Sequence, residues 1–309
     1  MFLRKNSYEI KEEDELLHRA TTEEKWRESY YFNWIDLENR ISGFSTIGIL
    51  PNQNKREFVF VLFFDKDSYF YYKEPMLEKN VNDIEITLQD KRLSYKMIIP
   101  FKEWQITYKD KKIDFKIKFT TRFKTFSFGT SSSASWQQHY EASGIVDGKI
   151  KFENGTNIKI IKGYGQRDKS WGFRDWHQFN KWYAGHFQFK DWAAAFRKDY
   201  RKNQMDLSGF VITDKTISRI SYIEIETTND KDCFKSPLLS TYNIISEDKK
   251  EFKIKAERIA TNSYARLARD FQDGYTELYE QMVIMKDLKT NEIGTGMSEE
   301  LRTIINLSE

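Results

Sequence analysis

Short segments in which polar and apolar residues alternate recur along most of the chain. Phe115, Ile117 and Phe119 give a clear example, because every second residue of an extended strand faces the same side. The run Phe58–Phe64 is apolar throughout, which is typical of a strand buried on both faces. Such segments follow one another at close spacing, without the strand–helix–strand rhythm of a parallel sheet. The pattern predicts an all-β protein made of antiparallel barrels or sandwiches.

The length of the chain indicates more than one barrel. It has 309 residues, about twice the length of a small eight-stranded barrel. We therefore predict two β domains in tandem, residues 1–178 and residues 179–309. The polar stretch before Trp26 predicts a short helical or irregular lead-in. Two further local predictions are a strand over Ile84–Leu88 and a short terminal helix over Leu301–Leu307.

Charge and composition exclude several classes of function. The 50 basic and 47 acidic residues leave a net charge of +3, so no broad surface for nucleic acid is expected. The N-terminal segment lacks the apolar core of a secretory signal, and no apolar run has the length of a membrane span. A cytoplasmic location is expected. The single Cys233 excludes an intramolecular disulfide and a multi-cysteine metal site, and we predict an inert thiol.

The segment Gly163–Trp176 differs most from the rest of the chain. Its fourteen residues include three glycines, two Arg-Asp pairs, two tryptophans and a tyrosine. Glycine lets backbones approach closely, and a buried Arg-Asp pair is costly unless both charges are satisfied. The combination is typical of a cavity wall rather than a surface loop. Read as a strand, the segment has Tyr164, Gln166, Asp168 and Ser170 on one face and Arg167 and Lys169 on the other.

Three of the four histidines, His139, His177 and His186, lie in or near this segment. The fourth, His18, is expected on the surface. By alternation His139 shares a face with Glu141, and His186 shares a face with Trp182. A facial triad of His139, His186 and a carboxylate would suit a metal. No metal is predicted, because close ligand spacing such as His-x-His is missing, and the glycines do not form a dinucleotide-binding fingerprint.

A cavity lined by tryptophan and tyrosine with one buried carboxyl group suits acid catalysis. Burial raises the pKa of a carboxyl group, so Asp168 would stay protonated near neutral pH and could donate its proton. Aromatic faces stabilise a developing positive charge. Together these features suit protonation of an alkene or polyene, followed by capture of water or by ring closure. The same pocket without chemistry would carry a lipid or isoprenoid.

The run Gly-Tyr-Gly-Gln-Arg-Asp168-Lys-Ser-Trp-Gly172, preceded by Trp136-x-x-His-Tyr-Glu141, resembles the carotenoid 1,2-hydratase (hydroxyneurosporene synthase) and AttH-like superfamily. More closely, it resembles an uncharacterised branch with the pattern Gly-x-Gly-x-Arg-Asp-His-Ser-Trp-Gly-x-Arg-Asp-Trp. The resemblance implies two lipocalin-like barrels in tandem, with a pocket for an apolar substrate at or near their interface. It also implies that Asp168 is the proton donor, as the counterpart of the aspartate in the hydratase pattern Tyr-x-Asp-His-Asn-x-Gly. Lys169 and Ser170 stand where that pattern has His and Asn, so hydration is not the only reaction to consider.

These observations give each candidate residue a predicted role. The predicted catalytic residues are Asp168, His186 and Glu141. The predicted substrate-binding residues are Tyr164, Trp171, Trp176, Trp182 and His139. The predicted structural residues are Arg167, Arg174 and Asp175.

Three functions remain open from the sequence. The first is a cofactor-free hydratase (a lyase) or cyclase acting on isoprenoid double bonds. The second is a non-catalytic carrier of a lipid or terpenoid. The third is a β module that binds a partner protein and has no cavity of drug size, about 300 Å³ or more. The first two imply an apolar ligand (isoprenoid, polyene or lipid), for which peripheral contact with a membrane would give access.

Overall fold

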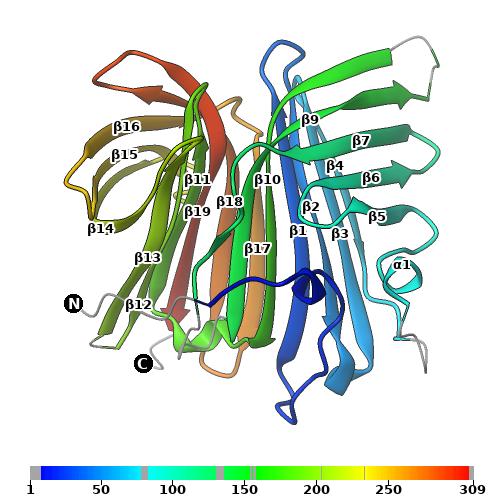
Figure 1. Cartoon of the computed structure of the whole chain (residues 1–309). Coiled ribbons are helices and arrows are strands. Elements are labelled where there is room, and N and C mark those ends of the chain that lie inside the picture. Colours follow the sequence, from blue (N-terminus) through cyan, green and yellow to red (C-terminus); the bar gives the residue numbers. More distant parts are fainter. Residues whose placement is uncertain are drawn as a thin grey trace. The chain divides into compact units, whose positions relative to one another are not determined.

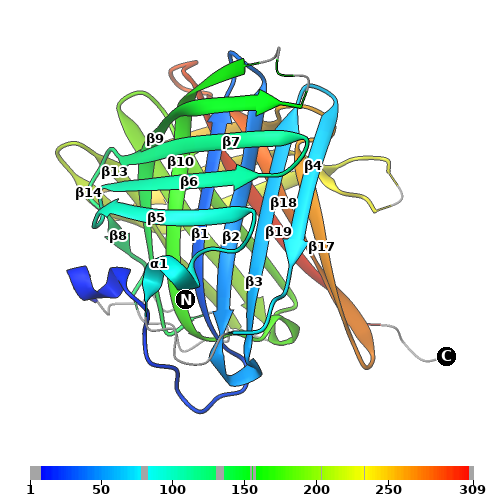
Figure 2. The same ribbon diagram turned by 90° about the vertical axis from the view of Figure 1, so that its right-hand side faces the viewer.

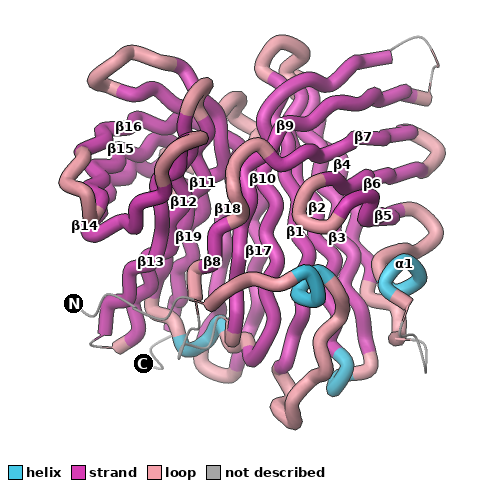
Figure 3. Tube along the Cα trace, viewed as in Figure 1, coloured by secondary structure: helices cyan, strands magenta, loops and turns pink. Residues whose placement is uncertain are grey.

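A computed structural model of the protein describes residues 8–77, 83–129, 136–153, 155, 158–202, 204–232 and 234–305. Cys233, predicted to be an inert thiol, lies outside the described residues. Strands make up most of the described chain and the helices are short (Figure 3). No helix in the described ranges has the length and apolar character needed to cross a membrane. The chain divides into two compact units, one ending at Arg174 and the other beginning at Asp175.

The first unit is a 10-stranded antiparallel sheet with the strand order β4-β3-β2-β1-β10-β9-β7-β6-β5, and β8 pairs with β9 beside this path (Figure 1). Its strands are β1 Trp26–Asp36, β2 Ile41–Leu50, β3 Lys55–Phe64, β4 Asp67–Lys73, β5 Leu93–Ile99, β6 Glu103–Lys109, β7 Ile113–Thr121, β8 Phe126–Ser127, β9 Gln138–Phe152 and β10 Ile158–Phe173. Its helices are α1 Ile84–Thr87 and two 3-10 helices, Glu12–Glu15 and Pro51–Gln53. The sheet curls into a half-barrel, so that β5, β6 and β7 run across β1, β2 and β3 (Figure 2).

Aromatic side chains fill the inside of this curl. Trp34 of β1 packs on Phe115 of β7, with ring centroids 4.7 Å apart. Phe60 of β3 stacks on Tyr108 of β6 at 4.1 Å. All four rings are buried. Large buried aromatic rings contribute strongly to stability, and here they pack β1 and β3 against β7 and β6 across the curled sheet.

The second unit is a sheet with the order β16-β15-β14-β13-β12-β11-β19-β18-β17, in which β16 also pairs with β18. This pairing closes eight strands into a barrel, and β17 pairs with β18 beside it. Its strands are β11 Lys181–Gln188, β12 Trp192–Arg201, β13 Gln204–Thr213, β14 Ile217–Asn229, β15 Pro237–Ser246, β16 Glu251–Arg258, β17 Tyr264–Phe271, β18 Gly274–Asp287 and β19 Ile293–Ile305. A 3-10 helix, Trp176–Gln178, precedes them.

The predicted fold class is confirmed. The chain is nearly all β, with lipocalin-like antiparallel units, and its lead-in contains the short helix Glu12–Glu15. The predicted boundary after residue 178 falls a few residues beyond the division between the two units. It stays a prediction.

Two local predictions are wrong. Ile84–Leu88 contains the helix α1, because the Asp83 carboxylate accepts hydrogen bonds from the backbone N–H groups of Glu85 and Ile86 at 2.8 and 3.3 Å. Such an N-cap favours a helix over the strand that the alternation indicated. Leu301 continues β19, because it pairs with β18 on one side and β11 on the other. Residues 306 and 307 lie outside the described residues.

Candidate functional site

Asp168 lies near the middle of β10, between β1 and β9. It pairs with Tyr31 on β1 and with Glu141 on β9. The predicted alternation is present, since Arg167 points into the aromatic core, with its guanidinium carbon 4.8 Å from the ring centroid of Trp104. Asp168 and its face of β10 therefore belong to the outer face of the curled sheet. The candidate site is built on regular, hydrogen-bonded strands rather than on a loop.

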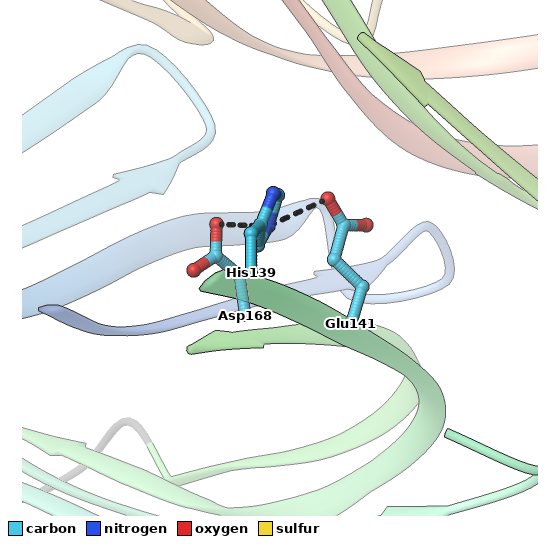
Figure 4. Close-up of side chains that lie close together, drawn as sticks. All are labelled: His139, Glu141 and Asp168. Atoms are coloured by element: carbon cyan, nitrogen blue, oxygen red, sulfur yellow. Dashed lines mark ion pairs between the residues drawn. The ribbon is translucent and has the colours of Figure 1, made fainter. Parts of the chain in front are cut away.

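His139 lies between two carboxylates on this outer face (Figure 4). Its Nε2 atom is 3.1 Å from Oδ2 of Asp168 and 3.3 Å from Oε1 of Glu141. His139 and Glu141 are two residues apart on β9, so they share a face. Side-chain exposure is 8% for His139 and Glu141 and 25% for Asp168. Asp168 is therefore the member of the cluster most accessible to a ligand.

The two carboxylates change the proton affinity of His139. Burial alone would lower the pKa of the imidazole, but the charges and hydrogen bonds of Asp168 and Glu141 outweigh this effect and raise it to about 9. The imidazole therefore carries its proton at neutral pH. Asp168 and Glu141 are the ion-pair partners of this imidazole, and the role of Asp168 as the proton donor stays a prediction.

Two aromatic rings fix the imidazole of His139. The ring of Phe128 stacks on it, with centroids 4.6 Å apart and planes inclined by 12°. The ring of Trp136 meets it edge to face at 4.7 Å. The backbone N–H of Phe128 also donates to the carbonyl of His139 at 2.8 Å. Both rings were missing from the predicted site, although Trp136 is part of the Trp-x-x-His pattern that preceded the motif.

The inner face of β10 carries two buried cations. Arg167 donates to both carboxylate oxygens of Glu15, at 2.5 and 2.6 Å. Lys169 donates to Oε1 of Glu28 at 2.5 Å and to two backbone carbonyls of the lead-in, at 2.6 and 2.8 Å. Both cations attach the lead-in to the sheet. Lys169 points away from Asp168 and does not contact it, whereas His139 of β9 lies beside Asp168.

Trp171 lies on the same inner side of β10 as Arg167 and Lys169. Its ring stacks on His18 with centroids 3.7 Å apart. His18, expected on the surface, also lies 2.9 Å from the Glu28 carboxylate through Nδ1. The structure therefore does not bring Trp171 to the face that carries Asp168.

Three further predicted residues are Tyr164, inside β10, and Arg174 and Asp175, which follow its last residue Phe173. Tyr164 shares the face of Asp168, and the guanidinium carbon of Arg122 lies 4.4 Å from the centroid of its ring. Arg174 donates to the Ser170 hydroxyl at 2.8 Å. Asp175 begins the second unit, where its carboxylate lies 3.8 Å from Nδ1 of His177.

Trp176, Trp182 and His186 belong to the second unit. The two tryptophan rings meet edge to face, with centroids 5.7 Å apart. Trp182 also donates from Nε1 to Glu299 at 2.6 Å, and the guanidinium carbon of Arg197 lies 3.6 Å from the centroid of its ring. His186 is buried on β11, with its ring 6.4 Å from that of Phe210. Within the second unit these residues form polar and aromatic contacts that need no ligand.

His139, Glu141 and Asp168 also have the composition of a metal-ligand set. Their ligand atoms all lie within 4.8 Å of one another, and they form the one such group among the described residues. One imidazole nitrogen with two carboxylate oxygens suits several divalent transition metals. The distances between these ligand atoms are therefore compatible with a proton shared between the imidazole and a carboxylate, and also with a bound metal ion.

A pocket of about 550 Å³ lies elsewhere in the first unit. Its lining contains none of the predicted site residues. It is formed by Asp67, Ser68, Tyr69, Lys112, Phe152 and Glu153.

Comparison with known proteins identifies a family and a fold. Residues 11–303 match the model of the family described as "Domain of unknown function (DUF7064)". No curated protein matches the chain. The solved structures that match share the fold at very low sequence identity, so they support the fold that the AttH-like resemblance implied and leave its motif and branch as predictions.

Three of these structures cover nearly the whole chain. A putative AttH from Nitrosomonas europaea matches with a TM-score of 0.68 and 9% identity, covering 98% of this chain and 99% of that chain. CghA with Sch210972 has a TM-score of 0.65 and 9% identity, covering 92% and 90%. Kievitone hydratase from Nectria haematococca has a TM-score of 0.61 and 7% identity, covering 90% and 89%.

Proposed function

The chain belongs to the family described as "Domain of unknown function (DUF7064)", and we propose that it is an enzyme acting on an apolar isoprenoid or polyene. It adds water to a double bond or closes a ring by acid catalysis without a cofactor. The observation that carries this proposal is the position of His139 between Asp168 and Glu141. The fold supports it as well, because a hydratase, kievitone hydratase, is built on the same fold.

The proposed reaction begins with the proton shared by His139 and Asp168. This proton passes to one carbon of the double bond and leaves a carbocation on the other. The faces of Phe128 and Trp136, which pack on His139, stabilise positive charge next to them. In hydration, water adds to the cation and loses a proton to Glu141, which returns it to His139. In cyclisation, a second double bond attacks the cation, and a carbon next to the new cationic centre then loses a proton to Glu141, which returns it to His139.

The raised pKa of His139 favours a conjugated substrate over an isolated double bond. A raised pKa of about 9 makes the His139 imidazolium a weaker acid, so proton transfer to an isolated double bond is costly. A polyene spreads the positive charge over several carbons and lowers that cost. The proposed substrate is therefore a conjugated isoprenoid rather than a simple alkene.

Turnover by matched variants tests this proposal. The protein is incubated with the conjugated polyenes all-trans-retinol and lycopene as probes and with geranylgeraniol, whose double bonds are isolated, as the comparison. Products are identified by mass spectrometry. A product heavier by one water indicates hydration, and an isomer indicates cyclisation. Asp168→Asn is expected to lower turnover by about 10²- to 10⁴-fold, the usual contribution of a general acid. Asp147→Asn makes the same change at an exposed position of β9 and should keep full activity.

Two outcomes oppose the proposal. Full activity of Asp168→Asn would remove this residue from the chemistry. Binding of a probe by the unaltered protein, seen as a change in tryptophan fluorescence but without product, would support the carrier function instead.

A further inference from the structure

The strand β4 forms one end of the 10-stranded sheet. Among the described strands it pairs only with β3, and Figure 2 shows it beside β3 at the margin of the sheet. In an antiparallel ladder, alternate residues direct their backbone groups to the two sides of a strand. An end strand can therefore take up one further strand along its open side.

The composition of β4 favours such pairing. Its four central residues, Tyr69–Tyr72, are all aromatic, a residue type that is enriched in strands. Phe70 is 62% exposed and Tyr72 is 57% exposed. The only charges of the strand, on Asp67 and Lys73, lie at its two ends and cancel. A seven-residue edge with aromatic residues and no net charge is prone to pair with another strand.

The other end strands are guarded in ways that β4 is not. In β17 of the second unit, Arg266, Arg269 and Asp270 place charges within the strand, a common protection of a sheet edge. At the opposite end of the first sheet, Ser94 of β5 forms a bridge with Gln89 that covers part of the edge. An end strand with aromatic residues along its centre thus distinguishes β4 from these two strands.

The charges around β4 are arranged symmetrically about Phe70. Lys66 and Asp67 precede the aromatic residues, and Lys73 and Glu74 follow them. If a second copy of the strand lies antiparallel with Phe70 opposite Phe70, then Asp67 of each copy stands opposite Lys73 of the other. Lys66 likewise stands opposite Glu74. Opposite charges in facing positions stabilise a strand pair, so the segment is complementary to itself.

Other alignments of the two strands bring like charges together. A shift by one residue places Lys66 opposite Lys73 in one direction and Asp67 opposite Glu74 in the other. A parallel arrangement places Asp67 opposite Asp67 and Lys73 opposite Lys73. Like charges in facing positions are destabilising. Because Glu74 already lies 3.3 Å from Nζ of Lys55 in its own chain, the pairs of Asp67 with Lys73 are the main selection for the antiparallel alignment.

We propose that β4 is a docking edge for a second copy of this chain, which pairs antiparallel with it about Phe70. Backbone hydrogen bonds and facing aromatic side chains supply the attraction, and the charges at the strand ends set the alignment. The pairing is two-fold symmetric and uses the same edge in both copies, so it stops at a dimer. This inference does not depend on the proposed reaction.

Sedimentation velocity over a series of protein concentrations provides the first test. The chain has a mass of 37.1 kDa, and we expect the measured mass to approach twice this value as the concentration rises. A monomer at every concentration would overturn the proposal.

Two charge reversals test the alignment. Asp67 and Lys73 are both exposed, so Asp67→Lys and Lys73→Asp should fold. Each variant alone places like charges opposite each other twice in the dimer, and we expect its self-association to weaken by about tenfold or more. In an equal mixture of the two variants, every facing pair again joins opposite charges. The mixture should therefore form a heterodimer, which also shows that both variants are folded.

Asp114→Lys is the matched control for these reversals. Asp114 is exposed on β7, which pairs with a strand on each side, β6 and β9. The same charge change there should leave association unaltered. Dimers of Asp67→Lys as stable as those of the unaltered protein, or a mixture that stays monomeric, would show that the second copy does not pair in this way.

A cysteine at the centre of the pairing tests the two-fold axis directly. In a Cys233→Ser background, Phe70→Cys brings two thiols opposite each other, with Cα atoms about 4.5–5.5 Å apart in an antiparallel pair. This distance suits a disulfide, so mild oxidation should give a cross-linked dimer on a non-reducing gel. Tyr222→Cys, at an exposed position of β14 between two paired strands, should give little. Equal cross-linking of the two variants would contradict the proposed axis.

Discussion

Asp168 and His139 face each other across the β9–β10 pairing, with Oδ2 of Asp168 3.1 Å from Nε2 of His139. The residue that follows Asp168 in the chain is Lys169, and it points to the opposite face of β10. A strand places consecutive side chains on opposite faces, so a sequence neighbour of Asp168 cannot assist it directly. The partner of Asp168 comes from the adjacent strand, β9. The pairing places His139 opposite Ser170, which lies two residues after Asp168 on the same face of β10.

Replacing Asp168 should release the proton of His139. The charge of Asp168 is the largest of the effects that raise the pKa of His139 above 6.5 to about 9. In Asp168→Asn we expect the titration midpoint of His139 to move most of the way back toward its ordinary value. NMR titration of the His139 ring measures it. Asp147→Asn serves as control, and an unchanged midpoint in Asp168→Asn would contradict the ion pair.

The stability of the folded chain should depend on the His139 proton. Below about pH 6.5 the imidazole is protonated in the folded and the unfolded chain, and its ion pairs contribute fully. As the pH rises from there, the unfolded chain loses the proton first. The stabilisation then falls and is lost above the folded pKa of about 9. Urea unfolding should show a loss on the order of 2 kcal/mol across this window.

His139→Gln provides the comparison for this pH dependence. The variant lacks the titrating group, so its free energy of unfolding should change much less between pH 6.5 and 9. Parallel curves for the two proteins would show that His139 does not hold a proton in the way proposed.

The local pattern of the sequence predicts which face of β10 a side chain occupies. Alternation correctly separates Asp168 and Gln166 from Arg167 and Lys169. The same parity places Trp171 with Arg167. For this residue, alternation therefore predicts the occupied face, whereas the aromatic residue type alone indicates a place beside Asp168.

Local sequence patterns do not predict which residues these side chains contact. Glu15 lies 152 positions from Arg167, and Asn33 lies 133 positions from Gln166. Contacts at such separations depend on strand order and register, which long-range pairing sets. For the same reason the approach of His139 to Asp168 cannot be predicted from the sequence, since it depends on the register of β9 against β10.

Chelation separates the acid mechanism from a metal mechanism at the same three residues. The donor atoms of His139, Glu141 and Asp168 lie close enough to bind a divalent ion. Because the proposed reaction uses a shared proton, treatment with EDTA should leave turnover of the active probe unchanged. Loss of turnover that Zn²⁺ or Mn²⁺ restores would favour a metal centre.

The pair of Glu15 and Arg167 should be one of the strongest ties between the lead-in and the sheet. Both side chains are buried, with exposure of 0% and 1%, and the two hydrogen bonds are bidentate. Removing one partner of a buried pair leaves the other charge unpaired, which costs about 3–5 kcal/mol. We expect Glu15→Gln to lower the free energy of unfolding of the first unit by about this amount.

Glu13→Gln is the matched control, because Glu13 lies in the same 3-10 helix with 74% of its side chain exposed. It should change stability by well under 1 kcal/mol, as exposed ion pairs do. The double variant Glu15→Leu with Arg167→Met removes both charges and should regain much of the loss, since an apolar replacement of a buried pair is often neutral. Urea unfolding measures all three variants. Equal stability of Glu15→Gln and Glu13→Gln would show that the lead-in is not held by this pair.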